Sequence, residues 1–398
     1  YASKSLLSEG KWVKIRVDKT GIYKLSYADL KNMGFSDPSK VSVHGYGGWP
    51  LDEDFSKEYI DDVPSIPVWR GSDYLLFYGK GPVKWEYDSS SQTFVHTNNP
   101  YSLYGYYFVT DATPTNDMTS VAQASGASTR ITTYDDYLLH EQELVSVNQS
   151  GREFFGEDFS GARPRTISTF SSIPGITDAD GKVTMRFISR INSGSGTASL
   201  SINDSELLDI TIPSIQTVSS NVRSYTKAIP GTTTALWKGS KSEKNNVVVS
   251  YSSSGHTNVR LDYIRMQFVR TLRPYGACTF FRSLTSVGNA SRFVISEANS
   301  NTLVFDVTDA LNVKRVEADL NGSELSFTIP AGRLREFVLV QTNQTFPSPE
   351  VVGEVASSNL HGLEQRDMII ISAPSLVQQA ERLAVAHHEK DGLTRGDL

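Results

Sequence analysis

Trp12-Val-Lys-Ile-Arg-Val17 alternates apolar and basic residues, with a valine or isoleucine at every second position. A two-residue period places alternate side chains on opposite faces, so this run predicts a half-buried β-strand. Lys19-Thr20-Gly21 is expected to turn the chain, and Ile22–Leu25 to return as the second strand of a hairpin. Ser26 can then cap a short helix that ends at Gly34.

The strand pattern recurs along most of the chain, in short β-rich runs bounded by Gly, Pro, Asn, Asp or Ser. These runs predict strands at Val41–His44, Tyr74–Tyr78, Val83–Tyr87, Tyr104–Thr110, Val183–Ile191, Ala198–Ile202, Leu207–Ile212, Val247–Tyr251, Val259–Val269, Arg292–Ile295, Thr302–Val307, Val313–Leu320, Glu324–Ile329 and Glu336–Val340. Asn321-Gly322 predicts a two-residue hairpin turn. The fold class is therefore mainly β, with tandem β-sandwich or jelly-roll-like domains.

The pattern changes near the C-terminus. After a Pro-containing connector at Phe346–Glu350, the fully apolar run Met368–Ile371 predicts a buried strand, and an amphipathic helix is expected to begin near Pro374 or Ser375. A continuous apolar strand followed by a helix is typical of the start of a parallel α/β sheet. One such β-α unit cannot form a sheet alone. Residues from about Phe346 onward are therefore expected to be held only by packing against the β-domains, with fast amide exchange.

These patterns divide the chain into four parts. We expect an N-terminal β domain with one short helix over residues 1–115, a jelly-roll-like sandwich over 134–272, a further β segment over 273–345, and the connector with the β-α unit over 346–398. The polar stretch Ala112–Thr133 is expected to be a linker or long loop between the first two parts.

Composition excludes several classes of function. The chain has 398 residues, a formal charge of −6 and a pI near 5.7, without a strongly basic domain, so nucleic acid is a poor partner. Its apolar runs are far shorter than the roughly 20 residues that span a bilayer, so we expect no transmembrane segment. Cys278 is the only cysteine, which excludes an intrachain disulfide and a cysteine zinc cage. The first residue is Tyr1, which fits a mature protein whose export signal has been removed.

Motifs for hydrolysis and metal binding are incomplete. No serine has glycine at both the −2 and +2 positions, so the glycines of His44-Gly-Tyr-Gly-Gly48 are interpreted as a strand-end turn rather than an oxyanion loop. His140-Glu141 lacks a second histidine one helical turn later, and His387-His388 are adjacent, so neither pair fits a helical zinc site. Asp178-Ala-Asp180-Gly could contribute to a calcium site, but a hairpin turn is the favoured interpretation. The Gly-x-Gly pairs at Gly45-x-Gly47, Gly79-x-Gly81 and Gly194-x-Gly196 each lack the third glycine of a dinucleotide-binding fingerprint.

Two further features also have a structural interpretation. Cys278 could be a nucleophile if a histidine came near it in space, but a lone semi-buried thiol is usually inert. The five tryptophans could stack against sugars, although aromatic residues on strands more often pack in the core. They are Trp12, Trp49, Trp69, Trp85 and Trp237. The sequence therefore predicts no catalytic, metal-ligating or cofactor-binding residue and no cofactor.

Several segments, in order, resemble the type IX secretion sortases of the gingipain-like cysteine peptidase family. The resembling segments are Trp12–Val17 with Thr20–Tyr23, Gly79–Trp85, Asn99–Tyr101 with Tyr106–Phe108, Leu261–Ile264, Arg273–Gly276, Phe280–Arg282, Asp306–Asp309, and Asp367–Ile371 with the helix up to Gly392-Leu393. They span nearly the whole chain.

The resemblance implies an exported protein in which β-domains precede a caspase-like peptidase domain with a His and Cys dyad. The strand resembling Asp367–Ile371 opens that domain, and the catalytic residues lie beyond the next helix. The dyad therefore maps to no residue here, neither Cys278 nor His387, and this chain is not expected to be an enzyme. The full-length parent is expected to be a cysteine endopeptidase at the cell surface or outer membrane of a Gram-negative bacterium.

Three functional hypotheses follow. The first is a non-catalytic N-terminal β region that acts as a scaffold, interaction or prodomain-like support, with its own downstream peptidase domain or other outer-membrane secretion components as partners. The second is a carbohydrate-binding surface module that uses exposed aromatic residues. The third is a small-molecule enzyme with an unrecognised site.

Overall fold

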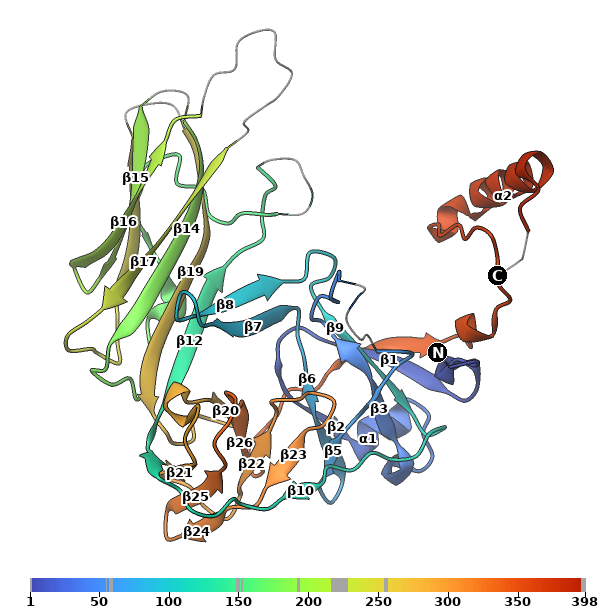
Figure 1. The fold of residues 1–398 in the computed structure, drawn as a ribbon, viewed down its shortest axis with the longest axis horizontal. Helices are drawn as coiled ribbons and strands as arrows, with labels where there is room; N and C mark the ends of the chain where they lie inside the picture. The colour runs from blue at the N-terminus through green and yellow to red at the C-terminus, as the bar shows by residue number, and fades with distance from the viewer. Residues whose placement is uncertain are drawn as a thin grey trace.

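The computed structural model describes residues 2–394 except 55, 57–59, 148–150, 152, 192–193, 216–227 and 254–256. The described part is mainly β, as predicted, and its strands form three units and an arm (Figure 1). We call the units the N-terminal unit, the central sandwich and the third unit. Six 3-10 turns connect the longer elements: η1 (Leu6–Ser8), η2 (Pro38–Lys40), η3 (Ser168–Phe170), η4 (Leu284–Ser286), η5 (Leu360–Gly362) and η6 (Pro374–Leu376).

The N-terminal unit packs a five-stranded sheet, in the order β27-β1-β9-β3-β4, against a three-stranded sheet, in the order β2-β6-β5. Its elements are β1 (Trp12–Val17), β2 (Gly21–Ser26), α1 (Tyr27–Asn32), β3 (Ser42–Gly47), β4 (Ser65–Ile66), β5 (Val68–Arg70), β6 (Tyr74–Gly79), β9 (Gly105–Thr110) and β27 (Glu350–Val355). The predicted helix is confirmed. Ser26 and Asp29 form a capping box at its start, and Gly34 follows its end with a φ of 93°.

The predicted β1–β2 hairpin is wrong, although both strands exist. β1 pairs with β9 and β27, whereas β2 pairs with β6 in the other sheet. The physical reason lies in β2, where the neighbouring residues Ile22 and Tyr23 are both buried. A strand with two buried faces belongs in a sheet that is covered on both sides.

The central sandwich packs the sheet β12-β19-β14-β17 against the sheet β13-β18-β15-β16. Its strands are β12 (Thr133–Glu141), β13 (Arg165–Thr166), β14 (Gly181–Ile191), β15 (Ser195–Ile202), β16 (Ser205–Pro213), β17 (Ile229–Trp237), β18 (Val247–Ser253) and β19 (Thr257–Thr271). Alternate residues such as Val183 and Met185 on β14 point into the shared core. The alternation that predicted these strands is therefore the alternation of core and outer faces.

The third unit packs the sheet β10-β23-β22-β26-β20 against the sheet β11-β21-β25-β24. Its strands are β10 (Ser120–Val121), β11 (Thr129–Ile131), β20 (Cys278–Phe281), β21 (Ser291–Ile295), β22 (Thr302–Asp306), β23 (Lys314–Val316), β24 (Asp319–Asn321), β25 (Glu324–Ile329) and β26 (Phe337–Gln341). The stretch Ala112–Thr133 is more than the expected linker, because its strands β10 and β11 pair in parallel with β23 and β21.

The sheet β2-β6-β5 is shared between two cores. Leu75 and Phe77 of β6 point into the core of the N-terminal unit. Leu76 and Tyr78 point the other way, into a cluster that includes Phe305 of the third unit. This double burial explains why β6 is a continuous apolar run, and it joins the two units through an apolar layer.

The C-terminal segment differs from its prediction in two ways. Met368–Ile371 is not a strand, because no described strand lies beside it to complete the hydrogen bonds, and Ile371 is 94% exposed. The expectation that residues from about Phe346 onward are held by packing alone is wrong for β27, which follows the connector and pairs with β1. The predicted helix is confirmed as α2 (Val377–Asp391), which lies apart from the β units (Figure 1).

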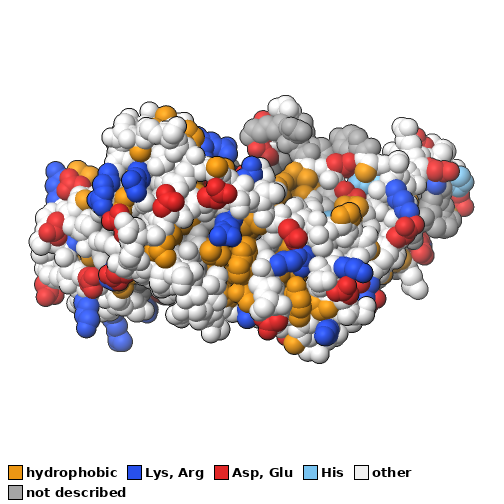
Figure 2. Space-filling view, turned by 90° about the horizontal axis from the view of Figure 1, so that it is seen from below, with side chains coloured by type: hydrophobic (Ala, Val, Ile, Leu, Met, Phe, Trp, Pro, Cys, Tyr) orange, Lys and Arg blue, Asp and Glu red, His pale blue; other side chains and the backbone are white. Residues whose placement is uncertain are grey.

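Surface charges of both signs are interspersed on the face shown in Figure 2, around a central group of hydrophobic side chains. This face therefore has no extended basic patch of the kind that binds nucleic acid. None of the helices in the described part is long and apolar enough to cross a bilayer.

Candidate functional site

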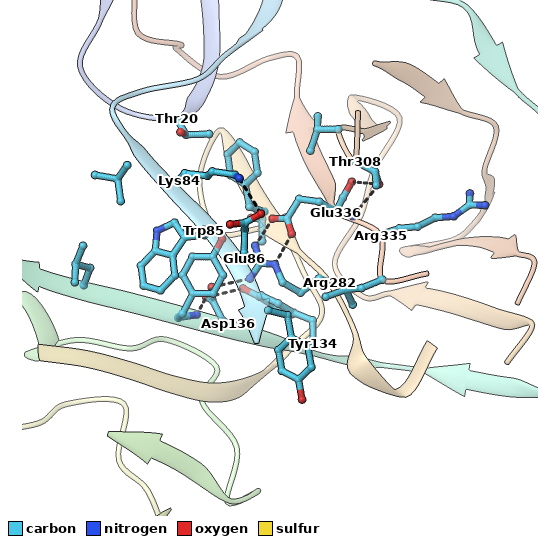
Figure 3. A pocket seen from close by; sticks show the side chains of 18 of the residues that line it. Thr20, Lys84, Trp85, Glu86, Tyr134, Asp136, Arg282, Thr308, Arg335 and Glu336 are labelled. Carbon is cyan, nitrogen blue, oxygen red and sulfur yellow. Dashed lines mark hydrogen bonds and ion pairs between the residues drawn. The ribbon is translucent and has the colours of Figure 1, made fainter. Parts of the chain in front are cut away.

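A cavity of about 1260 Å³ lies where the three units meet (Figure 3). Its walls come from β7 (Val83–Asp88), β12, β20 and the loop that precedes β26. Aromatic residues such as Trp85 and Tyr137 line it together with the charged residues Arg282 and Glu336. A large cavity with converging polar groups at a domain junction is the default candidate for a functional site.

One wall of the cavity is a two-stranded hairpin, which we call the arm. It consists of β7 (Val83–Asp88) and β8 (Thr93–Asn98), which pair only with each other among the described strands. Trp85 of the arm stacks on Tyr137 of β12, with 4.0 Å between the ring centroids. The arm therefore rests on the outer face of the central sandwich, beside the cavity.

Arg282 forms the centre of the junction. Its side chain is 2% exposed, and its guanidinium binds the Glu336 carboxylate through two nitrogens, with Nε 2.5 Å from Oε2. Nη1 donates to the backbone oxygen of Asp135 at 2.9 Å, and the guanidinium lies 4.3 Å from the centre of the Tyr137 ring. One arginine thus connects the third unit to the central sandwich.

The charges around Arg282 are paired with each other. Arg270 donates to Asp136 at 2.8 Å, and the Lys84 ammonium lies 2.8 Å from the Glu86 carboxylate. Burial raises the pKa of the Glu336 carboxyl, and the Arg282 guanidinium opposes this shift. A buried charge with a bidentate partner is suited to holding two units in register rather than to proton transfer.

Three backbone segments of the N-terminal unit come into close contact at Gly48, Lys80 and Gly105. A Cβ on Gly105 would lie 2.0 Å from the backbone oxygen of Lys80 and 2.8 Å from the backbone nitrogen of Gly48. The Gly48 nitrogen also donates to the Lys80 oxygen at 2.9 Å. Glycine is required at position 105 because backbone atoms occupy the place of a side chain.

Gly105→Ala is therefore expected to lower the free energy of unfolding by about 1–3 kcal/mol, since the methyl group must displace two backbone segments. Chemical denaturation measures the change. Gly161→Ala is the control, because a Cβ there would meet nothing within 4 Å. Equal stability of the Gly105 variant and the parent would contradict the packing described here.

Cys278 lies at the start of β20 and lines the cavity, but the described lining residues include no histidine. Burial raises the pKa of the Cys278 thiol to about 12. A catalytic cysteine needs the opposite shift, because the thiolate is the nucleophile. The half-buried position of Cys278 confirms the prediction of a semi-buried thiol, and its inertness stays a prediction.

Alkylation of Cys278 by iodoacetamide at pH 8 is expected to be on the order of a hundredfold or more slower than that of a free peptide cysteine. The raised pKa leaves little thiolate, and the fraction increases only as the pH approaches 12. Mass spectrometry of the folded protein gives the rate, and the unfolded protein is the control. A rate equal to that of the peptide would contradict a buried thiol.

The histidine pairs singled out in the sequence lie apart from Cys278. His140 Nε2 lies 2.7 Å from Glu157 Oε1, and the His140 ring packs against Phe170 of the sandwich core. His387 lies 2.6 Å from Asp391 on α2, one helical turn away, and His388 lies 2.9 Å from the Leu393 backbone oxygen. No group of three His, Cys, Asp or Glu side chains in the described part is arranged to hold a metal ion.

The other candidate motifs serve turns and packing. Asp178 accepts hydrogen bonds from Lys241 N and Ser240 Oγ in a bend that leads into β14, so the predicted turn is present but is not a hairpin turn. His44 is buried and lies 2.8 Å from the Thr113 hydroxyl oxygen.

The tryptophans mostly pack within the protein, as predicted. Trp12 and Trp237 are buried, Trp69 lies against Tyr74, and Trp85 stacks on Tyr137. Lys80 covers the Trp49 ring at 4.7 Å. Among the aromatic residues that the structure describes, Tyr101 is instead the most exposed, at 81%. These rings therefore form no continuous sugar-stacking platform among the described residues.

Sequence reasoning did not identify Arg282, Asp136 and Glu336 as a site. The available signal was an arginine directly after the strand run Cys278–Phe281, where an unpaired charge would be costly. Its partners are 54 and more than a hundred residues away in the sequence, so spacing could not identify them.

Comparison with solved structures gives a strong match to a known protein. The crystal structure of dimeric latent PorU from Porphyromonas gingivalis superposes with a TM-score of 0.87 and 34% sequence identity, covering 99% of this chain and 37% of that chain. An insecticidal delta-endotoxin from Bacillus thuringiensis has 10% identity and a TM-score of 0.22, covering 57% of this chain and 41% of the toxin, which is too low to indicate a shared overall fold. No protein-family model and no curated protein matches the chain.

Proposed function

Because this chain belongs to the PorU family of gingipain-like type IX secretion proteins, we propose that it is the non-catalytic N-terminal β region of a longer cysteine endopeptidase. The observation that carries the proposal is the match itself. It covers 99% of this chain but only 37% of the relative, so the chain spans little more than a third of that protein's length.

The β units act as a scaffold and prodomain-like support for the peptidase domain, in an exported protein at the cell surface or outer membrane. The raised pKa of Cys278 and the pairing of the charges in the cavity support this role.

The catalytic part of the proposal is tested with the chain alone. Incubation with a library of peptide substrates is expected to give no cleavage above that of the Cys278→Ala variant, because the thiol lacks an imidazole partner among the described residues of the cavity. Cleavage that is lost in the Cys278→Ala variant would overturn it.

The support role is proposed to act through the segment of residues 369–376, directly before α2. Ile369, Ile371 and Leu376 are apolar and largely exposed there, beside the helix α2. Contiguous exposed apolar residues of this kind mark a surface that another domain covers. The downstream peptidase domain is the proposed partner.

Calorimetric titration of this chain with the rest of the same protein, produced separately, tests the support role. Binding is expected, and Ile369→Asp combined with Ile371→Asp is expected to weaken it at least about tenfold. Leu360→Asp is the matched control, because Leu360 is an exposed apolar residue outside this segment. No binding, or a loss only with Leu360→Asp, would contradict the proposed contact.

A further inference from the structure

The arm is attached to the sandwich almost entirely by side chains. Phe94 N donates to Gln267 Oε1 at 3.1 Å, and Lys182 Nζ donates to the backbone oxygen of Gln92 at 2.8 Å. Asn98 Nδ2 donates to Glu143 Oε1 at 2.9 Å. Because the described strands of the arm pair only with each other, it can separate from the sandwich without breaking a sheet.

A buried group of titratable side chains lies beneath the arm. His96 of β8 has its Nε2 3.1 Å from Glu141 Oε2 of β12, and these side chains are 5% and 10% exposed. The His96 ring packs edge-on against Tyr263 of β19, with 4.7 Å between ring centroids. His96 Nδ1 is buried without a hydrogen-bond partner among the described residues. Arm docking therefore removes both His96 and Glu141 from water.

A β-bulge adds a second carboxylate to this group. Arg186 pairs with Tyr263 and Phe187 with Leu261, so Asp262 is the extra residue in the ladder between β14 and β19. A bulge redirects a side chain that regular alternation would place elsewhere. Here Leu261 enters the core, while Asp262 forms an ion pair with Arg186. We call Glu141, Asp262 and His96 the arm cluster.

The charges that face the arm cluster are mainly negative. Glu143 approaches from the loop after β12, and Glu153 lies 3.5 Å from Arg186. The cations are Arg186 on β14 and Arg265 on β19, and Arg265 lies over the Tyr263 ring at 4.9 Å. Lys84 and Glu86 of β7 pair with each other on the strand face opposite Trp85. Four carboxylates thus share two guanidiniums.

We propose that the arm is a pH-dependent clasp between the N-terminal unit and the central sandwich: the arm cluster binds a proton when the arm is docked and releases it when the arm leaves. Docking is then stronger at acidic pH and weaker at alkaline pH. Because Trp85 of the arm lines the cavity and rests on Tyr137, release of the clasp opens that wall of the cavity.

The linkage between proton binding and docking of the arm sets the direction of the pH dependence. Burial, together with the nearby Glu141 charge, raises the pKa of Asp262 to about 6, against the opposing effect of Arg186. A carboxyl whose pKa is higher in the docked state binds its proton more tightly there. Docking is therefore favoured as the pH falls through 6 and loses this contribution as the pH rises above it. Asp262 is therefore the member of the arm cluster that takes up the proton.

Hydrogen exchange on the full 398-residue chain tests the clasp. Amides of the arm are labelled at pH 5.0 and pH 8.0, with labelling times scaled to the intrinsic exchange rates. If Asp262 alone takes up the proton, its pKa is about 6 while the arm is docked and returns to the ordinary value for aspartate after release. The arm amides are then expected to be up to about tenfold more protected at pH 5.0 than at pH 8.0. Amides of β14 and β19 report global stability and are expected to show no matching change.

Two variants that keep the shape of the side chain test the assignment. Asp262→Asn removes the carboxyl whose pKa is raised and is expected to bring the protection ratio between the two pH values to within about twofold. Glu141→Gln removes a neighbouring charge that raises the pKa of Asp262 and is expected to lower the ratio. The second variant preserves the test if the first does not fold. Gln267→Leu is the control: it removes the acceptor of Phe94 N, so it lowers protection at both pH values and leaves the ratio unchanged.

Three results would overturn the clasp. The first is arm protection that is independent of pH in the parent protein. The second is a pH dependence that survives in both Asp262→Asn and Glu141→Gln, because the proton would then bind elsewhere. The third is a parallel change in β14 and β19, which would indicate global unfolding rather than release of the arm.

Discussion

Arg282→Met is expected to lower the free energy of unfolding by about 3–5 kcal/mol, because it leaves the partly buried Glu336 carboxylate without its partner. The variant also removes the donor to the Asp135 backbone oxygen and the cation beside Tyr137. Urea denaturation followed by tryptophan fluorescence measures the loss. Trp85 stacks on Tyr137 next to this site and reports on it directly.

The double variant Arg282→Met with Glu336→Leu separates the ion pair from its packing. Replacing both members of a buried pair by apolar residues is often neutral or stabilising, so the double variant is expected to recover most of the stability. Arg273→Met is the matched control, because its pair with Glu297 is largely exposed and contributes at most about 1 kcal/mol. A single variant as stable as this control would show that Arg282 does not hold the junction together.

Phe281→Ala is expected to cost about 3–5 kcal/mol, which is typical for a fully buried phenylalanine. Phe281 lies at the centre of an aromatic group in the third unit, 5.4 Å from the Phe337 ring and 5.7 Å from the Phe293 ring. The truncation leaves a cavity among rings that both sheets hold in place.

Thermal unfolding of Phe281→Ala beside Phe281→Leu measures this effect. The leucine variant keeps most of the buried volume and is expected to lose less than half as much stability. Tyr101→Ala is the control for removing an aromatic ring, since Tyr101 is exposed and should leave stability unchanged. Equal losses for Phe281→Ala and Tyr101→Ala would contradict the core described here.

The strands could be predicted from local patterns, but their partners could not. Alternation in Trp12–Val17 and the apolar run Tyr74–Tyr78 correctly marked β1 and β6. The chain proximity of β1 and β2 suggested a hairpin, whereas the two buried faces of β2 assign it to another sheet. Periodicity reports which residues are buried, and pairing depends on contacts far away in the sequence.

Met368–Ile371 is a second case in which local composition does not determine whether a strand forms. Its composition predicts a buried strand, yet the run is not a strand, because no described strand lies beside it, and Ile369 and Ile371 are exposed. The sequence does not predict β27, because its residues Val351 and Val352 are half-exposed and show no strand periodicity. β27 is a strand because it forms hydrogen bonds with β1.

The candidate site could not be predicted from local sequence patterns, because its residues come together only in the folded chain. Arg282 meets Glu336 and Asp136 only after three units assemble, and the bulge at Asp262 leaves no mark in the sequence. The position of Cys278 was easier to predict, because its small and aromatic neighbours in the strand indicated a packed thiol.

The most direct test of a supporting, non-catalytic β region is the peptidase activity of the full-length protein that carries Cys278→Ala. The value of kcat/KM is expected to stay within about twofold of the parent, because the nucleophile lies outside this region. A loss of about a hundredfold or more, with unfolding unchanged, would place the reacting thiol in these β units and contradict the account.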